Sequence, residues 1–64
     1  MNPECIIKLR KRLGMTQAKF AATIGVSFAT VNRWERGHFS PSPLAMDVLK
    51  AWDKIKEQED ADIG

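Results

Sequence analysis

Apolar residues recur at helical spacing in four separate segments of this 64-residue chain. The first segment carries Ile6, Leu9 and Leu13 on one side, which is the spacing of an amphipathic helix. The two central segments are shorter, and the fourth runs from Pro43 to about Glu57. This pattern predicts an all-α fold in which four helices bury their apolar stripes against one another.

Residues that begin or end helices flank these segments. Asn2, Thr16 and Ser27 each stand just before a segment, where a side-chain oxygen can accept from free backbone N–H groups. Gly25 and Gly37 follow the two central segments, at positions where helices often end in a left-handed conformation. Two helices separated by about four residues with a glycine in the turn are typical of a helix-turn-helix.

The helix predicted over residues 28–36 carries polar and basic side chains on one face. With Val31 inward and about 100° per residue, the outward face holds Ala29, Arg33 and Arg36, with Asn32 beside them. Arginine can bind guanine O6 and N7, and asparagine can bind adenine N6 and N7. We therefore expect this helix to enter the major groove of DNA. The alternative is an ordinary solvated face of an amphipathic helix.

Residues 16–37 resemble the Cro/CI-type helix-turn-helix of phage repressors and of xenobiotic-response-element regulators. The matching residues are Thr16-Gln17, Ala21, Gly25-Val26-Ser27, Val31 and Trp34-Glu35-Arg36-Gly37, with Arg10, Leu13-Gly14 and Pro41 outside the motif. The resemblance covers roughly residues 5–50 and departs from the usual pattern at Phe28. It implies a compact lambda-repressor-like domain of four helices, or five, over residues 1–57. Residues 58–64 are expected to form an acidic, frayed tail.

The resemblance and the helix faces together assign expected roles to individual residues. Base edges are expected to meet Ser27, Phe28, Ala29, Asn32 and Arg33, with Phe28 and Ala29 against thymine methyl groups. Phosphates are expected to meet Thr16, Gln17, Thr30, Arg36 and His38. Gln17 should also brace the recognition helix, as its counterpart in the family does.

Arg10 and Glu35 have an expected structural role. In the resembled family, an arginine at the position of Arg10 pairs with a glutamate near the end of the recognition helix. A planar guanidinium can satisfy a carboxylate with two hydrogen bonds while partly buried. We therefore expect this pair to set the angle of the recognition helix. The alternative is two unrelated surface charges.

The charges are distributed unevenly along the chain. The formal net charge is +2, yet residues 57–64 hold four acidic residues and no basic one. Residues 1–56 therefore hold ten bases and four acids, a net charge of +6. A basic body favours binding to a polyanion through counterion release, although ordinary surface charge is the alternative.

Length and composition exclude several classes of protein. A chain of 64 residues has room for one small domain. One cysteine and one histidine are too few for a disulfide or a metal framework, so we expect no metal and no cofactor. No nucleophile–base pair is recognisable, so we expect no enzyme. No apolar run approaches the roughly 20 residues of a membrane span, which favours a cytoplasmic location without membrane contact.

The predicted function is sequence-specific regulation of transcription by binding double-stranded DNA, as a repressor of prokaryotic or phage type. One recognition helix reads too few base pairs for genomic specificity, so we expect a weak homodimer on a pseudo-palindromic operator. The alternative function is an antitoxin that binds a toxin partner and represses its own operon, with Trp52 and the acidic tail as the protein contact.

The last helix is expected to supply the dimer contact. Leu44, Val48, Trp52 and Ile55 recur on one stripe, which Met46 and Leu49 widen. Trp52 and Ile55 extend beyond the part needed to cover a four-helix core, so they are the expected contact between subunits. The alternative is that both complete the monomer core. Phe39, in the loop before this helix, is expected to cap the core or to add to the same contact.

Overall fold

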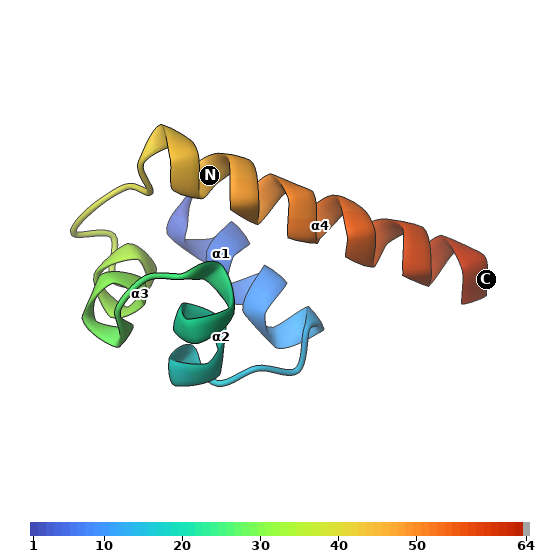
Figure 1. Cartoon of the computed structure of the whole chain (residues 1–64), viewed down its shortest axis with the longest axis horizontal. Coiled ribbons are helices and arrows are strands. Elements are labelled where there is room, and N and C mark those ends of the chain that lie inside the picture. The colour runs from blue at the N-terminus through green and yellow to red at the C-terminus, as the bar shows by residue number, and fades with distance from the viewer. Residues whose placement is uncertain (64) are drawn as a thin grey trace.

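The computed structural model describes the backbone of residues 1–63 and the side chains of residues 1–58. Its helices are α1 (Pro3–Arg12), α2 (Gln17–Ile24), α3 (Phe28–Glu35) and α4 (Pro43–Ile63). No strand occurs among residues 1–63. The first three helices lie along one half of α4, whose C-terminal part extends beyond them (Figure 1). The predicted all-α fold of four helices is confirmed.

Three helices begin at the N-caps that the sequence predicts. The side chains of Asn2, Thr16 and Ser27 each accept from the backbone N–H three residues later, at 2.8, 3.1 and 3.1 Å. These bonds satisfy donors that have no partner within the helix. α2 ends at Gly25, whose φ of 90° is costly for a residue with a Cβ atom. The caps therefore limit the turn between α2 and α3 to residues 25–27.

A small apolar core joins all four helices. Among the side chains that the structure describes, the buried apolar ones are Ile6, Leu9, Phe20, Ala21, Val31, Trp34 and Leu49. Phe20 of α2 and Val31 of α3 are both fully buried, so the inner faces of the two central helices are locked into this core. Tight packing of this kind fixes how α3 is presented to solvent.

α4 faces the core with only part of the predicted stripe. Leu49 is buried, and Ala45 and Trp52 pack against the core. Leu44 and Ile55 are instead 77% and 49% exposed. The predicted single stripe is therefore divided: Trp52 packs against the core, whereas Leu44 and Ile55 face away from it.

The reason is that α4 carries apolar residues on two neighbouring faces. At 100° per residue, the stripe of Leu44 and Ile55 lies roughly 90° from the stripe that packs inward. Val48 lies on the outer stripe and is half-buried. α4 also continues to Ile63, past the end predicted near Glu57. Fraying of this end stays a prediction, and Gly64 lies outside the described residues.

Candidate nucleic-acid interface

α3 presents one side to the core and the other to solvent. Val31 and Trp34 are buried, whereas Phe28, Ala29 and Arg33 are exposed. This division matches the faces that the sequence predicts. Most of the residues expected to read bases therefore lie on the accessible side of one helix.

Ser27 and Thr30 use their hydroxyl groups at the start of α3. Ser27 Oγ accepts from the Thr30 backbone N–H at 3.1 Å and lies 2.8 Å from Thr30 Oγ1. Each hydroxyl keeps further hydrogen-bonding capacity, because a hydroxyl has one donor and two acceptor positions. The structure thus assigns both residues to fixing the helix start, and their contacts with DNA stay predictions.

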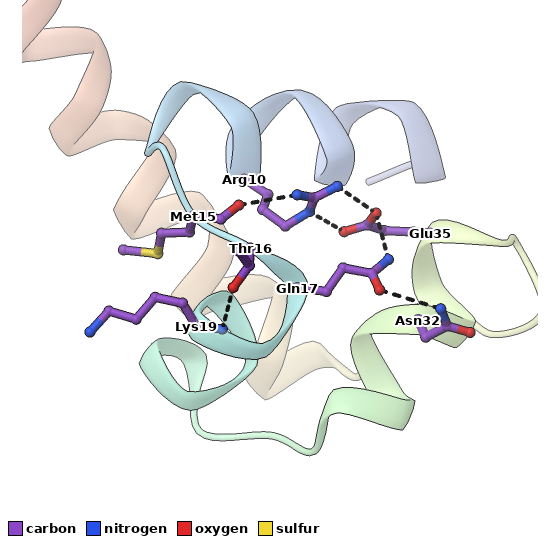
Figure 2. A network of polar contacts seen from close by, with 7 residues as sticks. All are labelled: Arg10, Met15, Thr16, Gln17, Lys19, Asn32 and Glu35. Carbon is purple, nitrogen blue, oxygen red and sulfur yellow. Dashed lines mark hydrogen bonds and ion pairs between the residues drawn. The ribbon is translucent and has the colours of Figure 1, made fainter.

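A polar network links α1 and α2 to the end of α3 (Figure 2). Arg10 Nε donates to Glu35 Oε2 at 2.7 Å, and Arg10 Nη2 donates to Glu35 Oε1 at 3.1 Å. The remaining Arg10 nitrogen, Nη1, donates to the Met15 carbonyl oxygen at 3.1 Å. The two side chains are only 16% and 6% exposed. The bidentate pair implied by the family resemblance is present, and it ties the last turn of α3 to α1.

The Glu35 carboxylate is held in its charged form. Burial by itself raises the pKa of Glu35, because desolvation disfavours a charge. The hydrogen bonds from Arg10 and Gln17, together with the positive charges of Arg10 and Lys11, outweigh burial and leave the pKa below its ordinary value of 4.5. The ion pair is therefore formed at neutral pH.

Gln17 extends this network to Asn32, one of the residues expected to read bases. Its Nε2 donates to Glu35 Oε1 at 3.0 Å, and its Oε1 accepts from Asn32 Nδ2 at 3.4 Å. This is the brace on the recognition helix that the resemblance implies. Within the described residues, Asn32 Oδ1 has no hydrogen-bond partner, so one acceptor and one N–H are left for a base.

Arg33 has a neighbour that sequence reasoning missed. Its guanidinium carbon lies 5.7 Å from the centroid of the Phe39 ring. Phe39 is 62% exposed, so the prediction that it caps the core is wrong. Pro41 of the same loop is the residue that is buried. No local periodicity relates Arg33 to a residue in the following loop, so the sequence carries no direct signal for this contact.

The remaining phosphate candidates lie at the ends of the two central helices. Thr16 is the exposed N-cap of α2, Arg36 is the exposed C-cap of α3, and His38 is exposed in the loop that follows. Their contacts with phosphate stay predictions.

The described part of the chain offers neither a metal site nor a membrane span. There, no three His, Cys, Asp or Glu side chains come together as a group able to hold a metal ion. No described helix is both long enough and apolar enough to cross a membrane.

A family model described as helix-turn-helix matches residues 6–49. The match includes the whole of α2 and α3, most of α1 and the first part of α4. Fold, site and match agree in defining a helix-turn-helix DNA-binding domain. The chain belongs to the helix-turn-helix family, of the Cro/CI type that its motif resembles.

A curated relative is similar to most of the chain. The antitoxin MqsA of Escherichia coli (strain K12) is 34% identical over 55 residues, which is 86% of this chain and 42% of the relative. The chain thus spans less than half the length of that antitoxin. No solved structure gives a significant match.

Proposed function

We propose that this protein is a sequence-specific transcriptional regulator that represses by occupying its operator. One observation carries the proposal: α3 presents Arg33 and Asn32 beside each other on its outer side. Arg10 and Gln17 fix this helix to α1 and α2 through their hydrogen bonds to Glu35. A helix presented in this way, after a three-residue turn, suits the major groove.

In the proposed complex, α3 lies in the major groove and its side chains read base edges. Arg33 binds guanine O6 and N7 through two N–H donors. Asn32 offers Oδ1 and its second N–H to adenine, while Gln17 holds the other N–H and so fixes the direction of the amide. Phe28 and Ala29 are exposed apolar groups that suit thymine methyl groups.

Phosphate contacts orient α3 and supply affinity that does not depend on sequence. Backbone N–H groups in the first turn of α2, together with Thr16 and Gln17, suit one phosphate. Arg36, the C-cap of α3, and His38, in the loop that follows, suit another. The net charge of +6 over residues 1–56 adds attraction that weakens with salt.

We also infer that the regulator acts as a weak homodimer on a pseudo-palindromic site. The support is the outer stripe of α4, where Leu44 and Ile55 are exposed and Val48 is half-buried. This stripe spans roughly 16 Å of helix at 1.5 Å per residue, enough for a second copy to pack against it. Because Trp52 packs against the monomer core, Leu44 and Ile55 replace the pair Trp52 and Ile55 as the proposed contact.

A second candidate function is that of an antitoxin that binds a toxin and represses its own operon. The supporting observation is the 34% identity to the antitoxin MqsA over 55 residues. Because this chain spans 42% of that protein, toxin binding rests on the likeness alone. Co-expression with the product of an adjacent gene, followed by co-purification, would separate the two functions.

Selection of bound sites from random DNA, followed by a salt titration on the best site, tests the proposed function. We expect enriched half-sites about one helical turn apart, and an affinity that falls linearly on a log–log plot against salt. Binding without any enriched sequence would contradict a sequence-specific regulator.

A further inference from the structure

The contact between Arg33 and Phe39 joins the best candidate base reader to a loop residue outside the motif. The 5.7 Å from the guanidinium carbon to the ring centroid lies within the range of a cation–π interaction. Within the residues that the structure describes, no hydrogen bond or ion pair engages the Arg33 guanidinium. Among these residues, the ring of Phe39 is therefore the group against which this guanidinium lies.

The loop that carries Phe39 is itself fixed to α3. The His38 backbone N–H donates to the Arg33 carbonyl oxygen at 3.0 Å, and the Gly37 N–H donates to the Trp34 carbonyl oxygen at 3.1 Å. On the other side of Phe39, Pro41 is buried. The backbone is thus fixed on both sides of Phe39, by hydrogen bonds before it and by the buried Pro41 after it. This restraint keeps the ring beside Arg33.

A pocket of about 180 Å³ lies beside the ring and is lined by Thr30, Arg33, Trp34 and Phe39. The ring is largely exposed and is not one of the buried core residues. A 62% exposed phenylalanine contributes little to burial, so its position needs a reason other than stability of the fold.

Stacking on a ring leaves an arginine able to read a base. The ring engages the face of the guanidinium, whereas the N–H donors that bind guanine lie along its edge. A free arginine loses considerable rotamer freedom when it binds, and prior restriction of that freedom lowers the cost.

We propose that Phe39 is a positioning residue that orders Arg33 for base reading, and so raises preference for the base that Arg33 contacts. This inference rests on the proposed function, and it deepens it by adding a specificity-determining residue outside the recognition helix. The aromatic face, rather than apolar bulk, is the property required.

Three variants separate the effect of the aromatic ring from that of apolar bulk. Phe39→Leu keeps apolar bulk and removes the ring, Phe39→Tyr keeps the ring, and Arg33→Ala removes the group being positioned. Affinity is measured on the best selected site and on the same site with the base under Arg33 changed. We expect Phe39→Leu to lose about two- to fivefold on the best site and nothing on the changed site, and Phe39→Tyr to keep wild-type affinity.

Two further measurements distinguish positioning of Arg33 from a merely structural role of Phe39. In the Arg33→Ala background, Phe39→Leu should cause no additional loss of affinity. In the free protein, NMR relaxation of the Arg33 Nε–H bond should show greater motion in Phe39→Leu than in Phe39→Tyr, with no DNA present.

An unchanged affinity in Phe39→Leu, an equal loss on both sites, or a loss that persists without Arg33 would each overturn the inference. If Phe39→Leu is silent while Arg33→Ala relaxes base preference, only the role of Phe39 fails. If wild-type protein selects no sequence at all, the proposed function fails, and the NMR comparison still decides whether Phe39 orders Arg33.

Discussion

Arg10 and Glu35 form a nearly buried bidentate ion pair that joins α1 to the last turn of α3, with Arg10 Nε 2.7 Å from Glu35 Oε2. Gln17 of α2 donates to the same carboxylate, so the Glu35 side chain connects α1, α2 and α3. The position of the recognition helix therefore depends on a polar contact as well as on the apolar core.

Breaking this pair should destabilise the fold more than breaking a surface pair. Arg10→Met leaves the Glu35 carboxylate, which is only 6% exposed, without its charged partner. We therefore expect a loss of about 1–3 kcal/mol in unfolding free energy. Urea unfolding followed by circular dichroism measures it. The matched control is Asp53→Asn, which removes the negative charge from the exposed Arg12–Asp53 pair and should cost under about 1 kcal/mol. Equal effects of the two variants would contradict the account.

Lowering the pH should destabilise the fold by protonating the Glu35 carboxylate. The pKa of Glu35 is lowered in the folded state, so folding binds fewer protons at this group than the unfolded chain does. Its stabilising contribution is complete above the ordinary value of 4.5 and is lost as pH falls through the lowered pKa. Unfolding free energy measured against pH should therefore decline below about pH 4.5 in the wild type, and more weakly in Glu35→Gln. Parallel curves for the two proteins would assign the acid sensitivity to other carboxylates.

Close packing of α2 can be tested at Ala21, which is 2% exposed. Ala21→Leu adds bulk where the core has no room, and we expect a loss of about 1–3 kcal/mol in unfolding free energy. Ala22→Leu makes the same change at the next, exposed residue of α2 and should stay within about 0.5 kcal/mol of wild type. A melting temperature for Ala21→Leu equal to that of Ala22→Leu would argue against this packing.

The fold could be predicted from the sequence wherever the signal was local. Asn2, Thr16 and Ser27 are short polar residues directly before apolar periodic segments, and each one caps a helix in the structure. The pair of Arg10 and Glu35 lies 25 residues apart, and only the family resemblance pointed to it.

The rest could not be predicted because it depends on tertiary packing. α4 is apolar on two neighbouring faces, so periodicity alone could not decide whether Leu44 or Leu49 turns inward. The contact of Phe39 with Arg33 depends on how the loop after α3 folds back, and an isolated phenylalanine suits a core position equally well in the sequence.

The homodimer predicts a specific effect of Ile55, which is 49% exposed on the outer stripe of α4. Ile55→Lys should weaken self-association about tenfold without unfolding the monomer, because it places a charge in an apolar contact. Sedimentation equilibrium, alone and with operator DNA, measures this. Lys54→Ser, on another face of the same turn, is the control and should leave association unchanged. Monomers bound one per site, and unaffected by Ile55→Lys, would rule the dimer out.

The central claim is that the exposed face of α3 reads bases, with Arg33 as the principal reader. Its most direct test compares Arg33→Ala with Arg36→Ala on the best selected site and on every single-base variant of that site. We predict that Arg33→Ala loses about 1–3 kcal/mol and relaxes preference at one base position. Arg36→Ala should instead weaken binding to all sequences alike and reduce the salt slope by about 1. A loss in Arg33→Ala that is equal on every sequence would contradict the claim.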